Sequence, residues 1–176
     1  RVTCDGGGSS GVDDFPRRRG TTVDVRNLFF NAPARAKFLK SVAAETRAVS
    51  EAVTTLALAN PRVAFTLTSE ERTLLEVAAA SDAASRLGQL WPGEEAGTLV
   101  AVAGEVGGVD IRGLVQRPDA AKPGLRRVHL FVNGRPFRSP ALVRAAERGY
   151  RTTIPHGVRP WIILYLEVPG GDVDVH

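Results

Sequence analysis

Hydrophobic and polar positions along the chain follow two spacings, and each spacing predicts a different kind of element. Segments in which β-branched or aromatic residues alternate with polar ones, or form a brief apolar run, are typical of strands. The dipeptides Gly107-Gly108 and Asn133-Gly134 are tight-turn signals at the ends of such segments. The predicted strands cover residues 22–30, 63–68, 73–77, 99–106, 109–116, 128–132 and 161–168.

Apolar residues at intervals of three and four predict helices between these strands. The longest helix begins at or just after Ser41 and ends before Pro61, because proline cannot continue a helix. A capping residue followed by proline predicts a short helix after Asn31 and a longer one after Ser139. A further helix covers residues 82–90. The apolar stripe of the longest helix comprises Val49, Ala52, Val53 and Leu56.

The order of these elements indicates the fold class. Strands and helices are mixed and include hairpins, in place of a strict βαβ alternation. This order predicts an α+β fold with a mixed sheet and helices packed on one face. The composition agrees, because 176 residues that are 43% hydrophobic and 24% charged contain enough apolar material for a folded core.

Hydropathy and the chain ends bear on where the protein works. The longest unbroken apolar run, residues 161–166, is far too short to span a membrane, and no secretory signal precedes the first strand. We therefore expect a cytoplasmic protein without a membrane partner. The sequence contains no Met and both ends read like parts of longer segments, so we expect an internal piece of a larger protein.

Residues suited to catalysis or metal binding are not grouped in this sequence. Cys4 is the only cysteine, which excludes an internal disulfide, and the three histidines lie far apart without metal-ligand spacing. No nucleophile has a plausible base nearby. Asp172 and Asp174 would share one face of a strand, where solubility of a sheet edge explains them better than a metal does. We predict no catalytic residue and no metal ligand here.

Positive charge is concentrated in one part of the chain. The formal net charge is only +4. Residues 112–159, however, contain ten arginines and Lys122 against Asp119 and Glu147, an excess of nine positive charges. Such a concentration is typical of a surface that binds a polyanion. A solvated, arginine-rich surface would give the same pattern.

The helix after Ser139 arranges part of this charge on one side. Its arginines recur at i, i+4 and i+7 and lie opposite its apolar residues, so they suit a row of phosphates. Exposed arginines on helices also serve only as a solvated face. The apolar side comprises Leu142, Val143, Ala146 and Tyr150. The candidate DNA contacts on this helix and just before it are Arg135, Arg138, Arg144, Arg148 and Arg151.

One run of twenty residues combines a strand, a turn and a capped helix. It reads Gly20-Thr-Thr-Val-Asp-Val-Arg-Asn-Leu-Phe-Phe-Asn-Ala-Pro-Ala-Arg-Ala-Lys-Phe-Leu39. With the same spacing, this run resembles the motif that ends the ATPase domain of the MutL family of DNA mismatch repair proteins, a family of GHKL ATPases.

Later segments are similar to the domain that follows in the family. The similarity is carried by Phe131-Val-Asn-Gly-Arg135, Tyr150, Pro160, the strand Leu164-Tyr-Leu166, Pro169 and Val173-Asp174-Val175. At His176 the family usually has asparagine. The resemblance implies that residues 1–40 end the GHKL ATPase domain with its last strands. Residues 41–176 then form a transducer domain with a fold like domain two of ribosomal protein S-five, truncated at its C-terminal end.

The resemblance also implies a role for nucleotide in the parent protein. Gly20 and Thr21 match the last ATP-contacting motif, and ATP and magnesium are expected cofactors of the parent. The other nucleotide motifs would lie before Arg1, and the lysine that reaches the terminal phosphate would lie beyond His176. We therefore expect this piece by itself to bind no cofactor and to be inactive as an ATPase.

The partners implied are those of a repair clamp. The parent would dimerise with a second copy, hold DNA largely without sequence preference, and pass a signal from a mismatch-sensing repair protein to a strand-cutting nuclease activity. This piece would relay the nucleotide state and contribute DNA-binding surface. Two alternatives stay open, namely an interaction and relay module without DNA contact and the transducer domain of a type II topoisomerase. The Leu-Phe-Phe-Asn-x-Pro-Ala-Arg run argues against the latter.

Overall fold

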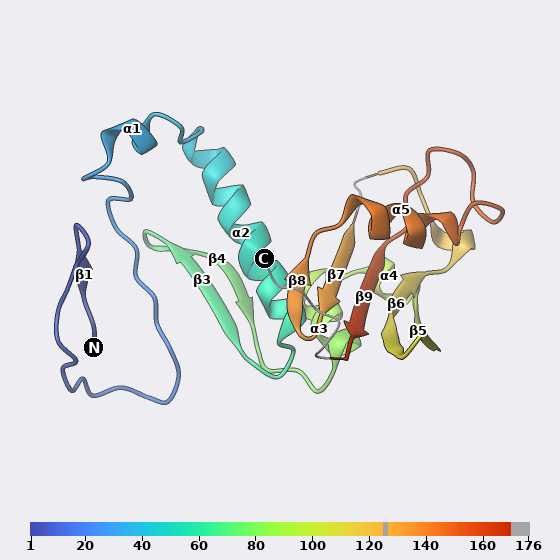
Figure 1. The fold of residues 1–176 in the computed structure, drawn as a ribbon, viewed down its shortest axis with the longest axis horizontal. Helices are drawn as coiled ribbons and strands as arrows, with labels where there is room; N and C mark the ends of the chain where they lie inside the picture. Colours follow the sequence, from blue (N-terminus) through green and yellow to red (C-terminus); the bar gives the residue numbers. More distant parts are fainter. Residues whose placement is uncertain (125–126, 170–176) are drawn as a thin grey trace. The chain divides into compact units, whose positions relative to one another are not determined.

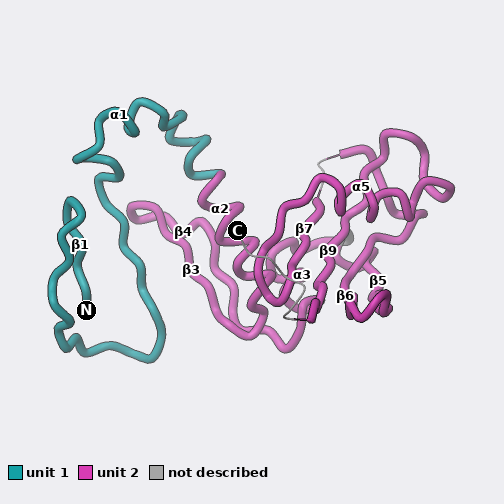
Figure 2. The backbone as a smooth tube through the Cα atoms, in the orientation of Figure 1, with its two compact units in different colours: residues 1–47 teal, residues 48–176 magenta. Residues whose placement is uncertain are grey.

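The computed structural model describes residues 1–124 and 127–169, and the chain divides into two compact units, residues 1–47 and 48–176 (Figure 2). The first unit contains little regular structure. Its elements are the paired strands β1 (Cys4–Asp5) and β2 (Gly8–Ser9) and the single-turn helix α1 (Pro33–Ala36). Proline occupies the first turn of α1 as expected, but no side chain caps this helix.

The strand predicted over residues 22–30 is not formed, and this prediction was wrong. Val23 and Val25, the residues that indicated it, are 80% and 67% exposed. A strand needs a neighbour that takes up its backbone N–H and C=O groups. Among the described residues no strand pairs with this segment, because β1 and β2 pair only with each other. Alternation alone therefore does not produce a strand here.

Helix α2 (Val42–Ala59) is the longest helix. It is followed by Asn60, whose side-chain amide donates to the Leu56 carbonyl at 3.0 Å. The predicted helix is confirmed, but the predicted apolar stripe is only partly buried. Val49 and Leu56 are 49% and 46% exposed, whereas Leu58 is completely buried. Only the last turn of α2 reaches the hydrophobic core, and the sheet selects the side that carries Leu58.

The segment after α2 forms a hairpin and a capped helix. Strands β3 (Phe65–Ser69) and β4 (Arg72–Val77) are antiparallel, and helix α3 (Ala83–Leu90) follows. The Asp82 carboxylate accepts the Ser85 N–H at 2.8 Å. This hydrogen bond is the main reason why the pKa of Asp82 lies below its usual value. The cap satisfies a backbone donor that the helix itself leaves unpaired.

A mixed five-stranded sheet forms the centre of the second unit. Its order is β5-β6-β9-β7-β8, in which only the β7–β9 pair is parallel. The strands are β5 (Leu99–Val106), β6 (Val109–Gln116), β7 (Val128–Val132), β8 (Arg135–Phe137) and β9 (Ile162–Glu167). The short helices α4 (Glu94–Gly97) and η1 (Pro118–Ala120) lie in its connections. Every strand and helix predicted between residues 63 and 168 is present, with small shifts at the ends.

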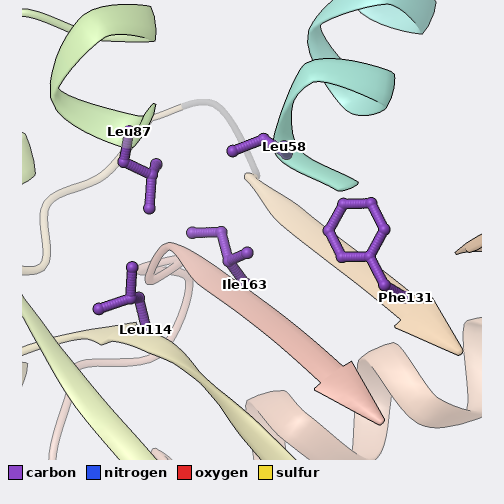
Figure 3. Packing of buried hydrophobic residues seen from close by; sticks show 5 residues of the cluster. All are labelled: Leu58, Leu87, Leu114, Phe131 and Ile163. Carbon is purple, nitrogen blue, oxygen red and sulfur yellow. The ribbon is translucent and has the colours of Figure 1, made fainter. Parts of the chain in front are cut away.

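One face of this sheet is covered by α2 and α3. The buried core comprises Leu58, Leu87, Leu114, Phe131 and Ile163, from α2, α3 and three strands (Figure 3). Burial of one such side chain stabilises the fold by roughly 1.5–3 kcal/mol. Tyr165 stacks on Phe131 with ring centroids 4.8 Å apart and donates to the Leu58 carbonyl at 3.0 Å. Burial raises the pKa of Tyr165 to about 12.

Helix α5 (Pro140–Arg148) lies across the other face of the sheet (Figure 1). Because side chains alternate along a strand, Leu130 and Ile162 point away from the Leu58 side of the sheet. Both are buried, at 4% and 1% exposure. The predicted α+β class with a mixed sheet is confirmed, and the structure adds a helix on this second face.

Candidate nucleic-acid interface

The β7–β8 hairpin positions the first of the candidate arginines. Asn133 and Gly134 both have positive φ, at 47° and 75°, which suits the tight turn that their sequence predicts. The Asn133 side chain also holds the neighbouring strand end, since its amide donates to the Val168 carbonyl at 3.0 Å and its carbonyl accepts the Val168 N–H at 2.8 Å. Arg135 follows the turn directly and is exposed.

Arg138 stands between β8 and α5 and remains largely in solvent. Its guanidinium lies 3.8 Å from a carboxylate oxygen of Glu51 on α2, and the two side chains are 90% and 64% exposed. An exposed pair at this distance contributes well under 1 kcal/mol to stability, because water screens both charges. The positive charge of Arg138 therefore stays available to a ligand.

Helix α5 separates apolar from basic residues as predicted. The Ser139 hydroxyl accepts the Leu142 N–H at 3.3 Å and caps the helix, and proline occupies the first turn. Val143 and Ala146 are half-buried and Tyr150 is buried, whereas Leu142 is 38% exposed. Three of the four predicted apolar positions thus face the protein.

The basic side of α5 faces solvent. Arg144 and Arg148 are exposed, and Arg151 lies in the turn after the helix, where its N–H donates to the Arg148 carbonyl at 3.1 Å. In the part of the chain that the structure describes, no ion pair holds Arg135, Arg144, Arg148 or Arg151. Guanidinium groups without carboxylate partners can bind phosphate oxygens through two parallel hydrogen bonds.

A pocket of about 530 Å³ lies beside Arg138 and Arg144. Its lining includes His129 of β7 and Glu51 and Thr55 of α2. Burial lowers the pKa of His129, and this effect is larger than the opposite effect of the Glu51 carboxylate. The imidazole is thus neutral at neutral pH, and it adds no charge to the basic surface.

Gly20 and Thr21, the predicted ATP contacts, lie in the first unit on exposed chain. Gly20 has φ of 140°, a conformation that glycine adopts easily, and the space around it is open. The Thr22 hydroxyl next to them accepts a hydrogen bond from Arg17 at 2.8 Å. By themselves these residues do not enclose a nucleotide.

Other chemistry is sparse in the described residues. Within residues 1–124 and 127–169, no three or more His, Cys, Asp or Glu residues come close enough to hold a metal ion. Cys4 is exposed and forms no disulfide. No helix in this part of the chain is long and apolar enough to cross a membrane. Asp172, Asp174 and His176 lie outside the described residues.

Two arginines acquire roles that sequence reasoning missed. Arg86 of α3 is completely buried and donates to the Pro61 carbonyl at 2.7 Å and to the Val63 carbonyl, which ties α3 to the chain before β3. Burial lowers its pKa. The Arg127 guanidinium lies over the rings of both Trp91 and Trp161, at 4.8 and 4.6 Å from their centroids. The sequence signalled Arg127 only as one positive charge among many.

Known proteins share both the sequence and the fold. A family model described as DNA mismatch repair protein, C-terminal domain, matches residues 88–176. The DNA mismatch repair protein MutL of Gemmatimonas aurantiaca is 44% identical over 160 residues, 91% of this chain and 26% of that protein. MutL of Anaeromyxobacter dehalogenans is 43% identical over 176 residues, 100% of this chain and 29% of that protein. The Aquifex aeolicus MutL ATPase domain complexed with ADP matches with a TM-score of 0.61 and 27% identity, over 86% of this chain and 58% of that chain.

The fold and the family model together define a DNA mismatch repair protein. Within that class, the chain belongs to the MutL family, as its sequence motifs implied. This membership excludes the topoisomerase alternative. The chain spans 26% and 29% of the lengths of the two relatives, so the activities of a whole MutL protein are not thereby assigned to it.

Proposed function

We propose that this chain is the part of a mismatch repair ATPase that relays the nucleotide state and contributes DNA-binding surface. Membership of the MutL family supports the repair role. The ADP in the related Aquifex aeolicus ATPase domain supports a nucleotide-dependent parent. One observation carries the DNA contact, namely the exposed arginines of α5 without ion-pair partners among the described residues.

The proposed contact is with phosphates and not with bases. Arg144 and Arg148 are one helical turn apart on the solvent side of α5, with Arg151 just beyond them. Arg135 and Arg138 extend the basic surface at the other end of the helix. Phosphate contacts fix a protein on DNA without reading its sequence, which is what a clamp requires. Binding of this kind weakens steeply as salt rises, because bound counterions are released from the DNA.

The larger protein would supply the rest of the activity. In this proposal it binds and hydrolyses ATP with magnesium, dimerises with a second copy in the cytoplasm, and closes on DNA. It then links a mismatch-sensing protein to a strand-cutting nuclease. Residues 1–40 would end the ATPase domain, with Gly20 and Thr21 contacting ATP, and residues 41–176 would form the transducer domain. The isolated chain would be inactive as an ATPase.

Duplex-DNA binding across a salt series tests the DNA contact. The logarithm of the binding constant should fall with the logarithm of salt concentration, with a slope of about −0.9 per phosphate contacted. The double variant R144E/R148E should bind more weakly and show a shallower slope. Arg72→Glu is the matched control, because Arg72 is an exposed arginine of β4, outside the basic surface.

The alternative function makes the opposite prediction. A module that only relays conformation and binds protein partners would bind DNA equally with or without Arg144 and Arg148. Equal affinities of the wild type and R144E/R148E across the salt series would therefore refute the proposed contact. A loss that Arg72→Glu reproduces would indicate a general effect of net charge and would refute it as well.

A further inference from the structure

A second basic pocket lies at the end of α5 that carries Tyr150. It has a volume of about 490 Å³, within the range of roughly 300–1,000 Å³ that is usual for ligand sites. Three separate parts of the chain, around residues 98, 116–127 and 159–161, bring it together. Its lining comprises Thr98, Gln116, Asp119, Ala120, Lys122, Pro123, Gly124, Arg127, Arg159 and Trp161. None of these residues is among the candidate DNA contacts that the sequence indicated.

Cations outnumber carboxylates in this pocket. Lys122, Arg127 and Arg159 line it, against the single carboxylate of Asp119. Asp119 is itself engaged by Arg117, which lies outside the lining, at 3.3 Å. Arg159 also lies 4.0 Å from a carboxylate oxygen of Glu147 on α5, which is at the limit of an ion pair. The pocket therefore keeps a positive charge that favours an anion.

Two indole rings hold one of these cations in place. The Arg127 guanidinium lies over both Trp91 and Trp161, at 4.8 and 4.6 Å from their centroids, and the two rings contact each other edge to face with centroids 5.5 Å apart. The backbone carbonyl of Arg127 also accepts the Ile162 N–H at 2.9 Å, which fixes this residue to β9. A side chain that is ordered before binding loses less entropy when a ligand arrives.

The buried amide of Gln116 makes the floor of the pocket rigid. Gln116 is 4% exposed. Its side-chain nitrogen donates to the Thr98 hydroxyl at 3.1 Å, and its side-chain oxygen accepts the backbone N–H of Trp161 at 3.2 Å. Its backbone carbonyl accepts the Tyr150 hydroxyl, which connects the pocket to the end of α5. The fold thus builds this cavity from satisfied polar groups, and its cations are left at the rim.

The pocket lies beside the C-terminal end of α5. Glu147 lies on α5 and approaches Arg159, and Tyr150 immediately after the helix reaches the pocket floor. The nine residues of α5 span about 13.5 Å. A helix of this length can contact only a few consecutive phosphates of one DNA strand.

We propose that the pocket lined by Lys122, Arg127 and Arg159 binds a phosphate group of the DNA backbone, beyond the contacts of the α5 arginines. This inference rests on the proposed function, because it takes DNA as the ligand of the same surface. Lys122 and Arg159 donate to the phosphate oxygens from the rim. Arg127 contributes a positive charge held against the two indoles.

Tryptophan fluorescence reports directly on this pocket. Trp91 and Trp161 are the only tryptophans of the protein, and both contact Arg127. Titration of the chain with duplex DNA should change their emission, and the change should saturate with the binding curve. Inorganic phosphate at matched ionic strength should compete only weakly. Complete displacement of DNA from the pocket by phosphate at micromolar concentration would make free phosphate the ligand and overturn the DNA assignment.

Salt-dependent DNA binding of two alanine variants completes the test. Lys122→Ala and Arg159→Ala should each reduce the magnitude of the salt slope by about 0.9, as expected for one lost phosphate contact. Lys122 is exposed, so its variant tests the pocket even where replacement of Arg159 disturbs the fold. Arg72→Ala serves as the control and should leave the slope unchanged.

The outcomes separate this inference from the proposed function. If R144E/R148E weakens binding while the Lys122 and Arg159 variants and the emission do not change, the pocket assignment is overturned and the α5 contact stands. If the pocket variants reduce the slope and the α5 variants do not, the pocket stands and the α5 contact fails. If DNA does not bind even at low salt, both fail.

Discussion

Replacement of Gly113 by alanine should break the sheet between β6 and β9. Gly113 pairs with Leu164 across these strands. A Cβ atom at Gly113 would lie 2.1 Å from the Ile163 carbonyl oxygen and 2.8 Å from a methyl carbon of Leu164. Side-chain carbons essentially never come within 3.0 Å of such atoms. The nearest atom is a backbone oxygen, which cannot rotate away as a side chain could. The backbone of β9 would therefore have to move by about an ångström.

The magnitude follows from the contacts that this movement disturbs. Overpacking of a tight site costs roughly 1–3 kcal/mol, and each ladder hydrogen bond weakened between β6 and β9 adds about 1 kcal/mol. The lower entropy of the unfolded alanine chain returns only about 0.4–1 kcal/mol. We expect Gly113→Ala to lower the free energy of unfolding by about 2–4 kcal/mol.

Gly104 provides the matched control. It lies on β5, the neighbouring strand, and nothing comes within 4 Å of the Cβ that alanine would add there. Gly104→Ala should be neutral or slightly stabilising. Chemical denaturation followed by circular dichroism gives both free energies. A Gly113→Ala variant within about 0.5 kcal/mol of the wild type would show that β9 yields without cost, and would refute the reasoning.

Three further predictions concern hydrogen bonds made by side chains. Tyr165→Phe removes the bond to the Leu58 carbonyl and should cost about 0.5–1.5 kcal/mol of unfolding free energy in denaturant titrations. Because the folded pKa of Tyr165 is raised to about 12, the wild type should lose stability as pH rises from about 10 towards 12, and Tyr165→Phe should lose less over that range. The pKa of Asp82 is lowered in the folded state, so its stabilisation is present above pH 3.8 and lost on acidification. Asp82→Ala should therefore lower the melting temperature more at pH 7 than at pH 2, and an equal loss at both would contradict the cap. Asn133→Ala removes both bonds to Val168 and should lower the free energy of unfolding by roughly 1–3 kcal/mol. Asn133→Gly should keep the turn, and thermal unfolding of the two variants compares their stabilities.

The local elements were predictable because their causes are local. The Asp82 and Ser139 caps act on N–H groups three residues away, and both predicted helices are present. The Asn133-Gly134 turn adopts the positive φ angles that its residue types favour. The family motif over residues 20–39 was equally readable, since spacing and residue type carry it without any knowledge of the fold.

The candidate site was predictable in part. Periodicity alone placed Arg144 and Arg148 on the solvent side of their helix, and the structure has them exposed. Their role as DNA contacts stays a prediction. The second pocket was not predictable, because Arg159 lies more than thirty residues after Lys122 and Arg127 and nothing in the sequence says that they meet.

The sequence by itself determined most of the helices and strands and the fold class, because caps, turn dipeptides and hydrophobic spacing act within a few residues. It also determined the family, through the residue types and spacing of its motifs. Tertiary structure alone decided which side of α2 is buried and why β6 requires glycine at position 113. It also brought Arg127 over the rings of Trp91 and Trp161. These features depend on the strand order β5-β6-β9-β7-β8, which brings distant segments into contact. Residues 22–30 show the converse. Their alternation indicates a strand, but among the described residues no neighbouring strand pairs with them, and so no strand forms.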